Sequence, residues 1–260
     1  MHKIILLLIL LLLAACGVQE VPPEAEYEIA QATEPETQPT TYETMPPVTS
    51  PPIIPTTPPP TEEVPTMPPE PVQPTFIAEP IPPHVIEQIT GSSFHENPHF
   101  DICHLAYLTV THVNFDGESQ IGHIIVAASI AEEVLDIFRE IYEGGFPIAR
   151  IRLIDYYGAD DYYSMADNNS VGFNFRYIAG TRTLSRHAWG MAIDINPIQN
   201  PFIRDGVILP AAGAEYLDRT NVRPGMIVPG DVVYNAFTSR GWIWGGHWTV
   251  PIDYHHFERR

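Results

Sequence analysis

The most regular pattern of hydrophobic and polar positions lies between residues 130 and 143. Apolar side chains recur there three and four residues apart, a spacing that places them on one face of an α-helix. Ser129 followed by Glu132 matches a capping box, and the glycines at 144–145 supply a stop. We therefore predict a helix from about Ile130 to Glu143 whose apolar stripe packs in the core and binds no cofactor. The stripe comprises Ile130, Val134, Leu135, Phe138, Ile141 and Tyr142.

Shorter apolar or alternating runs predict β-strands in the same half of the chain. The run at 191–195 leads into a turn at Asn196-Pro197. A helix followed by strands with irregular connections indicates an α+β domain in which helices flank a small antiparallel sheet. The predicted strands are residues 106–113, 148–154, 191–195, 231–234 and about 253–257.

The composition on the N-terminal side of these elements is very different. Residues 17–84 contain 20 of the 28 prolines and 11 glutamates, and they contain no lysine or arginine. Proline removes backbone donors, the glutamates repel one another, and few large apolar side chains are present to bury. We predict that residues 17–84 are a disordered Pro/Thr/Glu-rich tether. Residues 85–260 remain as one folded domain, long enough to bury a core.

The charge and the cysteine content exclude two classes of protein. The formal net charge is −19, and the chain has a single lysine. Such a chain lacks the cations that bind phosphate backbones, so nucleic acid is excluded as a partner. Two cysteines are too few for a small domain held together by disulfides. No protein partner is implied.

Residues 1–16 have the layout of a secretory signal. A short positive start precedes ten apolar residues, Ile4 to Leu13, and these are too few to span a bilayer, which needs about 20. The end of the segment, Leu-Ala-Ala-Cys, resembles a bacterial lipobox, in which the cysteine carries lipid. We predict lipidation of Cys16 and anchoring to the outer face of the cell membrane; an ordinary signal with a chance cysteine is the alternative. Cys103 is then interpreted as a small buried apolar residue.

Two segments, 185–194 and 253–258, carry the candidate chemistry. A catalytic zinc takes three ligands from histidine and carboxylate side chains and leaves one position open. His187 and Asp194 are seven residues apart, too far for one helical face. They can converge if His187 lies in a turn, bent at Gly190, and Asp194 on the strand that follows. A third ligand must come from elsewhere, and the second segment offers an imidazole and a nearby carboxylate.

These motifs together resemble a known family of enzymes. The pattern Ser-x-His-x-x-Gly-x-Ala-x-Asp at 185–194 is followed by Gly-Trp-x-Trp-Gly-Gly at 241–246 and Asp-x-x-His-Phe at 253–257. It is similar to the D-alanyl-D-alanine carboxypeptidase (VanY-like) zinc peptidases, which include the phage L-alanyl-D-glutamate endolysins. The resemblance covers about 165 of the 260 residues, from the region of Gly91 onward. It implies a zinc fold shared with hedgehog signalling domains.

The resemblance also implies roles for particular residues. Zn²⁺ would be bound by His187, Asp194 and His256, and Asp253 would be the general base that accepts the proton of the attacking water. The stretch around Arg176 resembles one that carries an arginine in the family. Arg176 is therefore expected to polarise the scissile carbonyl or to hold a substrate carboxylate.

Four neighbouring features leave alternatives open. Ser185 either bonds to the substrate or the ligand shell, or is a turn hydroxyl. His255 stands beside His256, and neighbours in an extended strand face opposite sides, so only one would reach the metal; the Asp-x-x-His spacing favours His256. His247 could line the cleft, although a place on its rim or on the surface is favoured. The tryptophans expected to pack under the site are Trp242, Trp244 and Trp248.

The sequence thus predicts a zinc peptidase that hydrolyses peptidoglycan stem peptides outside the membrane, as a D-alanyl-D-alanine carboxypeptidase does. An L-Ala-D-Glu endopeptidase is the first alternative. A wall-binding module that keeps zinc without hydrolysis is another, and an inert lipoprotein scaffold is the last. Asp253 argues against a binding module, because a purely structural metal site needs no base. The expected partners are peptidoglycan peptides and, through Cys16, the membrane.

Overall fold

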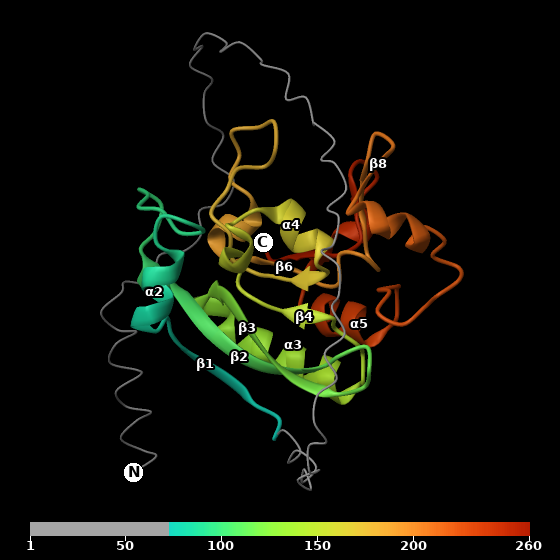
Figure 1. Ribbon diagram of the computed structural model, residues 1–260, viewed down its shortest axis with the longest axis horizontal. Coiled ribbons are helices and arrows are strands. Elements are labelled where there is room, and N and C mark those ends of the chain that lie inside the picture. Colours follow the sequence, from blue (N-terminus) through green and yellow to red (C-terminus); the bar gives the residue numbers. More distant parts are fainter. Residues whose placement is uncertain (1–72) are drawn as a thin grey trace, which may run out of the picture. The chain divides into compact units, whose positions relative to one another are not determined.

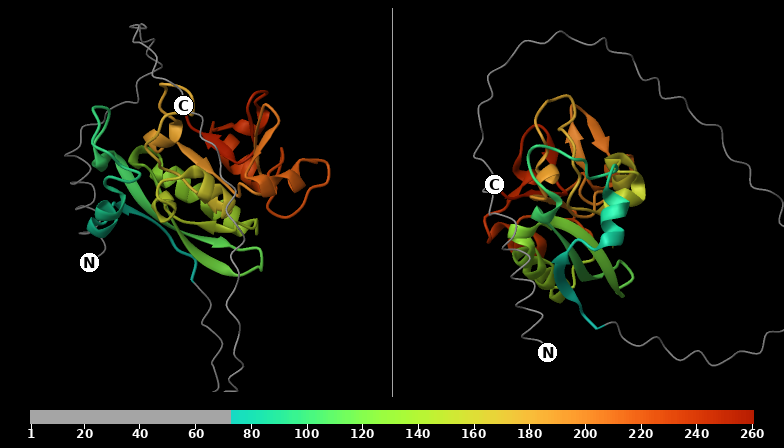
Figure 2. Two further views of the ribbon diagram at one scale, coloured as in Figure 1. Left: turned by 45° about the horizontal axis from the view of Figure 1, so that its top comes forward. Right: turned by 90° about the vertical axis from the view of Figure 1, so that its left-hand side faces the viewer.

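The computed structural model describes residues 73–260 (Figures 1 and 2). The predicted signal, Cys16 and residues 17–72 of the predicted tether lie outside the described residues. The described part is a mixed α+β structure with small antiparallel sheets, as predicted from the sequence. In both views of Figure 2 the first three strands (teal to green) and the C-terminal strands (orange to red) lie on different sides of this part.

The helices and strands alternate along the chain without a repeating unit. The α-helices are α2 (Pro83–Ile89), α3 (Ala131–Glu143), α4 (Asp161–Ala166) and α5 (Val232–Thr238). The strands are β1 (Phe76–Pro80), β2 (Leu105–Val113), β3 (Ser119–Ala127), β4 (Arg150–Ile151), β5 (Asn169–Ser170), β6 (Ala192–Asp194), β7 (Phe202–Arg204), β8 (Val207–Leu209), β9 (Ile243–Trp244), β10 (Ile252–Asp253) and β11 (His256–Glu258). The 3₁₀ turns are Ile102–His104, Ala128–Ile130, Ile154–Tyr157, Arg186–Trp189, Ala211–Tyr216 and Gly245–His247.

The largest sheet has the order β1-β2-β3 and is antiparallel throughout. Successive residues of a strand point to opposite faces, and β2 shows this clearly. Leu108 and Val110 pack in the cluster that contains Val134 and Phe138 of α3. Leu105, on the other face, packs in a second cluster with residues of α2. The sheet is therefore covered on one face by α3 and partly on the other by α2, as Figure 1 shows.

Helix α3 confirms the predicted helix but not its predicted start. Ser129 lies in the 3₁₀ turn Ala128–Ile130, the N-cap is Ile130, and no side chain caps the helix. The capping box is wrong because the chain leaves β3 through this turn, so Ser129 stands before the helix. The predicted stop is confirmed, since Gly144 is the C-cap and Gly145 takes a left-handed conformation with φ 65°.

The folded part begins before Val85, so the predicted boundary between tether and domain is too late. Residues 76–80 form β1, which pairs with β2 from Phe76 opposite Val110 to Pro80 opposite Ala106. Ile81 is buried. The proline-rich composition hid this strand, because an edge strand tolerates a proline at its end.

Three further predictions about local structure are corrected. The predicted strand at 231–234 is the start of α5, where the side chain of Asp231 caps the helix by accepting a hydrogen bond from the backbone N–H of Tyr234. A run of four residues was too short to distinguish strand from helix. Of the predicted strand at 148–154, only the two residues of β4 form a strand. The predicted strand at 253–257 is interrupted by a bend between β10 and β11.

Cys103 does not behave as predicted. It lies in the 3₁₀ turn Ile102–His104 that precedes β2, at the surface, and it is exposed. Within residues 73–260, no helix has the length and apolar character required to cross a bilayer.

The second antiparallel sheet, β6-β11-β9, carries the candidate site. It joins the main core through α5, where the ring of Phe237 stacks on Phe257 of β11 at a centroid distance of 4.2 Å. The third sheet, β10-β7-β8, places Asp253 opposite Phe202. The core thus fixes β11. Strand β10, which comes before β11 in the chain, carries Asp253.

Candidate metal centre

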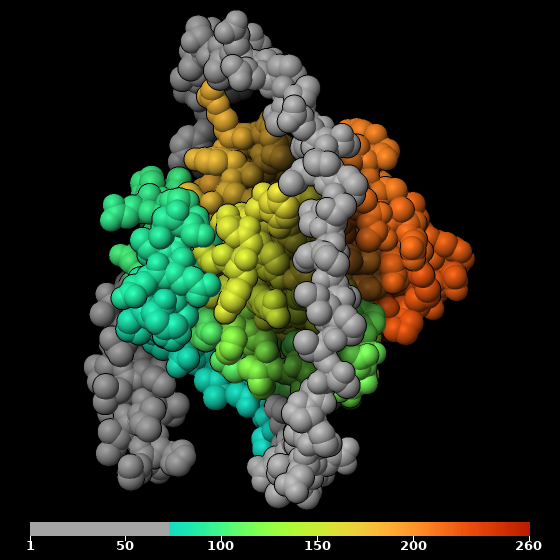
Figure 3. All heavy atoms as spheres, in the orientation of Figure 1, coloured from blue at the N-terminus to red at the C-terminus, as the bar shows by residue number. Residues whose placement is uncertain are grey.

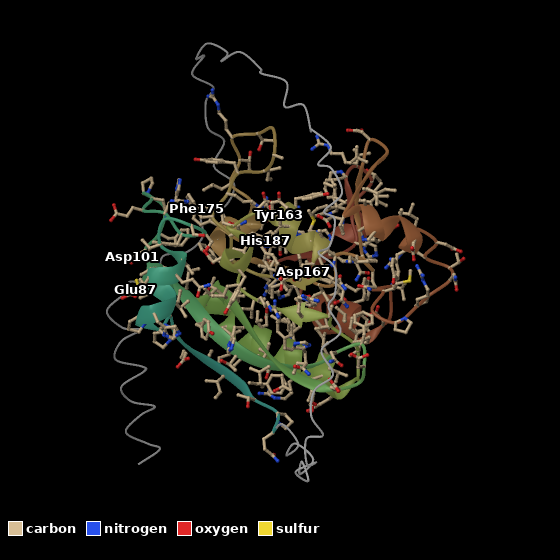
Figure 4. All side chains as sticks on the ribbon, in the orientation of Figure 1. Glu87, Asp101, Tyr163, Asp167, Phe175 and His187 are labelled. Carbon is tan, nitrogen blue, oxygen red and sulfur yellow. The ribbon has the colours of Figure 1, made fainter. Side chains whose placement is uncertain are left out.

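Three buried side chains that the sequence singled out as metal ligands lie together. One ligand atom from each of His187, Asp194 and His256 lies within 4.8 Å of the others. Nε2 of His187 is 3.2 Å from Oδ2 of Asp194 and 3.2 Å from Nδ1 of His256. Nδ1 of His256 is 3.0 Å from Oδ1 of Asp194. In Figure 4, His187 lies toward the middle of the view.

The sequence places His187 through a tight turn. Its 3₁₀ turn, Arg186–Trp189, is capped by Ser185, whose hydroxyl accepts a hydrogen bond from the backbone N–H of His187 at 3.3 Å. The turn ends at Gly190, which has a φ of 66°. A Cβ at this glycine would lie 2.4 Å from the backbone nitrogen of Ala127 on β3. Gly190 is therefore required both for the bend and for the close approach to the first sheet.

Asp194 and His256 meet because their strands pair. Asp194 ends β6, His256 begins β11, and the two residues are direct cross-strand partners in the antiparallel ladder. Side chains of such partners point to the same face, with Cβ atoms about 5 Å apart. Strand pairing therefore closes the gap of 62 residues between the two groups.

Hydrogen bonds at the far side of each imidazole select the nitrogen that faces the group. The Nδ1–H of His187 donates to the backbone carbonyl of Gly172, which leaves Nε2 facing the other two side chains. Nε2 of His256 lies 3.4 Å from Oε2 of Glu258, which leaves its Nδ1 facing the group. Such outer contacts orient the histidine ligands of metal sites.

Electrostatics keep the carboxyl of Asp194 ionised. Burial alone would raise its pKa, but the imidazoles of His187 and His255 and a hydrogen bond from His256 hold the pKa well below its usual range. Burial alone would likewise lower the pKa of His256, but Asp194 and Glu258 raise it to about 10. The group thus combines a fixed negative charge with the imidazole of His256, from which a metal ion would have to displace a proton.

The dimensions of the group fit a tetrahedral metal ion. Zinc bonds of about 2.0–2.1 Å in tetrahedral geometry put ligand atoms about 3.3 Å apart. The three distances in the structure are 3.2, 3.2 and 3.0 Å. Two imidazoles and a carboxylate are also the donor set of catalytic rather than structural zinc sites. The residues present therefore fit a divalent metal with an open position.

Asp253 and His255 lie directly beside this group. Nε2 of His255 is 3.0 Å from Oδ1 of Asp253 and 3.8 Å from Oδ2 of Asp194. Oδ1 of Asp253 is buried and accepts no hydrogen bond of good geometry from the described residues. Burial alone would lower the pKa of His255, but Asp253 and Asp194 raise it to about 9.

The sequence predicted that only one of His255 and His256 would reach the metal, and the reason given for it is wrong. It assumed an extended strand, whereas Tyr254 and His255 form a bend between β10 and β11. Both imidazoles consequently face Asp194. Only His256 belongs to the three-residue group, in line with the predicted spacing.

Arg176 stands near the site but pairs with an acid. Its guanidinium forms an ion pair with Asp161, the first residue of α4. Asn174, two residues earlier, donates its backbone N–H to the carbonyl of His187 at 3.1 Å and its side-chain amide to Asp161. In the space-filling view α4 (yellow) forms part of the surface between the N-terminal (teal) and C-terminal (orange) elements (Figure 3). The substrate role of Arg176 stays a prediction.

The tryptophan- and glycine-rich segment 241–246 and the two residues after it pack beside the site. Trp242 and Trp244 are buried in the main core, and Trp248 is half-buried against the ring of His256 at a centroid distance of 5.3 Å. A Cβ at Gly245 would lie 2.6 Å from the carbonyl oxygen of Asp253, so the motif requires glycine there. His247 is exposed, as predicted, with its ring against Trp244 and Tyr234.

Sequence reasoning missed the residues that orient the group. Glu258 could have been found, because it follows His256 by two residues on the same strand and so shares its face. Gly172 and Asn200 could not, because each contributes only a backbone carbonyl to an imidazole.

Comparison with known families gives a match over the C-terminal part of the chain. Residues 179–259 match the family model described as D-alanyl-D-alanine carboxypeptidase. The matched segment contains His187, Asp194, Asp253 and His256, and it begins after Arg176. Neither the curated proteins nor the solved structures gave a match. The family match supports a peptidase in this part of the chain, and the buried His-Asp-His group could bind the metal on which such peptidases depend.

Proposed function

We propose that this protein is a zinc-dependent peptidase that hydrolyses peptidoglycan stem peptides as a D-alanyl-D-alanine carboxypeptidase. The observation that carries the proposal is the buried group of His187, Asp194 and His256 beside a buried carboxylate oxygen of Asp253 that accepts no hydrogen bond of good geometry from the described residues. A site that only binds metal has no use for that oxygen, whereas a hydrolase needs it to accept a proton. The family match points the same way.

The ligand set would be Nε2 of His187, Nδ1 of His256 and the carboxylate of Asp194. When bound, zinc would act as a Lewis acid and lower the pKa of a coordinated water. Asp253 would take the proton of the attacking water on Oδ1 and deliver it to the leaving amine. Arg176 would serve the substrate once it is released from Asp161. The relationship of the fold to hedgehog domains belongs to the same proposal.

The bond cleaved distinguishes the two peptidase alternatives. The zinc-loaded full chain would be incubated with stem pentapeptides that end in D-Ala-D-Ala and with stem peptides that contain L-Ala-D-Glu. Mass spectrometry should show the loss of one terminal alanine from the first substrate. Cleavage of the second substrate between L-Ala and D-Glu would instead establish the endopeptidase. No product from either substrate, with one zinc bound, would refute hydrolysis and leave the wall-binding module.

We also propose that the chain is exported, lipidated at Cys16 and held on the outer face of the bacterial cell membrane. The support is the sequence of residues 1–16. A Cys16→Ala chain should be found as a precursor or in a released form, and no longer as the lipidated protein of the membrane fraction. It should also no longer incorporate labelled fatty acid. Unchanged incorporation would contradict the assignment. Peptidoglycan peptides outside the membrane are then the proposed partners.

A further inference from the structure

His255 is the buried titratable group beside the site that neither the ligand set nor the proposed chemistry uses. Its ring is almost fully buried, and the bend between β10 and β11 turns it toward the group. Nε2 lies 3.0 Å from Oδ1 of Asp253 and 3.8 Å from Oδ2 of Asp194. One imidazole nitrogen therefore faces both the proposed base and a proposed metal ligand.

The opposite side of the ring is anchored to a rigid part of the backbone. Nδ1–H of His255 donates to the carbonyl of Asn200 at 2.8 Å. A carbonyl only accepts, so this contact fixes which nitrogen carries that proton and which one faces the carboxylates. The backbone N–H of Ile195, the residue after Asp194, donates to the carbonyl of His255 at 3.0 Å.

Asn200 is itself held by a network of buried hydrogen bonds. Its side-chain amide donates to the carbonyls of Ile195 and Gly225, and its side-chain oxygen accepts from the backbone N–H of Ile227 and from the guanidinium of Arg219. Such a fully bonded buried amide has little freedom to move. The anchor of His255 is thus fixed relative to the strand that carries Asp194.

We propose that His255 is a positioning residue that holds the carboxylate of Asp253 at a fixed place relative to Asp194 and hence to the bound metal. The role rests on the proposed function, because it acts through the proposed base. Oδ1 of Asp253 accepts no hydrogen bond of good geometry from another group among residues 73–260, and Nε2 of His255 lies 3.0 Å from it. Without His255, that oxygen would lose the imidazole nitrogen that lies between it and Asp194, 3.0 Å from the one and 3.8 Å from the other.

A double-mutant cycle on the zinc-loaded full chain tests this role. His255→Leu fills the space without an N–H, and we expect kcat on a stem pentapeptide to fall about 100-fold, the usual cost of misplacing a reacting group by about 1 Å. KM and zinc content should stay within about twofold of wild type. Because His255 acts through Asp253, the double variant with Asp253→Asn should be no slower than Asp253→Asn alone. His95→Leu, at an exposed histidine, is the matched control.

His255→Gln keeps the test decisive if the leucine variant folds poorly. Its amide can still donate to Asp253, so we expect kcat about tenfold above that of His255→Leu. The role of His255 would be overturned if the losses of kcat from His255→Leu and Asp253→Asn multiplied in the double variant. Near-normal kcat in both single His255 variants would overturn it too, and neither result would contradict the proposed peptidase activity. Loss of zinc from His255→Gln would also overturn it, since His255 would then support the metal group. A zinc-loaded wild type that cleaves no stem peptide would refute the proposed function, and the role of His255 with it.

Discussion

Asp194 and His256 are direct partners across β6 and β11, with Oδ1 of the first 3.0 Å from Nδ1 of the second. These two strands of three residues therefore do more than close a sheet, because their ladder sets the spacing of two proposed metal ligands. His187 reaches the same point from a 3₁₀ turn that two residues separate from β6. The core, to which Phe257 attaches β11, therefore fixes the strand that carries His256.

The first prediction concerns metal stoichiometry. The purified chain should hold about one equivalent of zinc by elemental analysis, because three buried donors converge with tetrahedral spacing. His187→Ala and His256→Ala should each lose most of it. His247→Ala, an exposed histidine in the neighbouring turn, should retain a full equivalent. Full zinc in His256→Ala together with loss in His255→Ala would show that the wrong imidazole had been assigned.

The second prediction is a pH dependence of metal affinity. In the metal-free protein the carboxylates raise the pKa of His256 to about 10, so a metal that binds Nδ1 must displace a proton at neutral pH. The apparent affinity should rise roughly tenfold per pH unit between about pH 7 and 9 and level off near 10. Competition with a chelator of known protonation constants measures this. An affinity that is flat over the range would contradict the assignment.

The same groups predict the stability of the metal-free protein. The folded-state pKa values of His255 and His256 are about 9 and 10, both above the ordinary value for histidine. Their protonated forms therefore favour the folded state fully below about pH 6.5, and this contribution is lost as the pH rises toward 10. The melting temperature of the metal-free chain should fall between pH 7 and 10. A rise over that range would show that the sign is wrong.

The third prediction addresses Glu258. Its carboxylate faces Nε2 of His256 and so helps to turn Nδ1 toward the metal. Removal of such an outer partner typically weakens metal binding 10–100-fold, and we expect Glu258→Ala to do so without unfolding the protein. Glu87→Ala, at an exposed position of α2, is the matched control. Equal zinc affinity in the two variants would remove Glu258 from the site.

The fourth prediction tests the general base. Asp253→Asn keeps the shape of the side chain but cannot take a proton, so activity should fall by about 10²–10⁴-fold. Zinc content and melting temperature, measured on the same sample, should stay near wild type because the three proposed ligands are untouched. Loss of zinc along with activity would make Asp253 a ligand. Near-normal turnover with normal zinc would exclude it from the mechanism.

The fifth prediction concerns the N-terminal boundary. A chain that begins at Gln73 keeps β1 and should melt with the full chain. A chain that begins at Val85 loses β1 and the buried Ile81, worth about 3 kcal/mol, so its melting temperature should be lower by roughly 6–12 °C. Equal melting temperatures for the two shortened chains would show that β1 is not part of the stable fold.

The part of the fold that the sequence predicted is the part governed by local periodicity. Helix α3 and strands β2 and β6 lie where their patterns placed them, because each is long or apolar enough to show its own period. The first turn of α5 was mistaken for a strand, since the buried residues that reveal its helical spacing, Ala236 and Phe237, follow the short run. Strand β1 was hidden by prolines, and β3 gave no clear pattern.

For the site, the sequence by itself named the residues that lie together, because its motifs and the family resemblance that they carry single out His187, Asp194, Asp253 and His256. Only the tertiary structure decided how they meet. Strand pairing joins residues 62 positions apart, and a bend lets both His255 and His256 face Asp194. The carbonyls of Gly172 and Asn200, which orient two imidazoles, leave no mark on the sequence. Backbone groups are the same at every residue, so only the fold can reveal which of them a side chain meets.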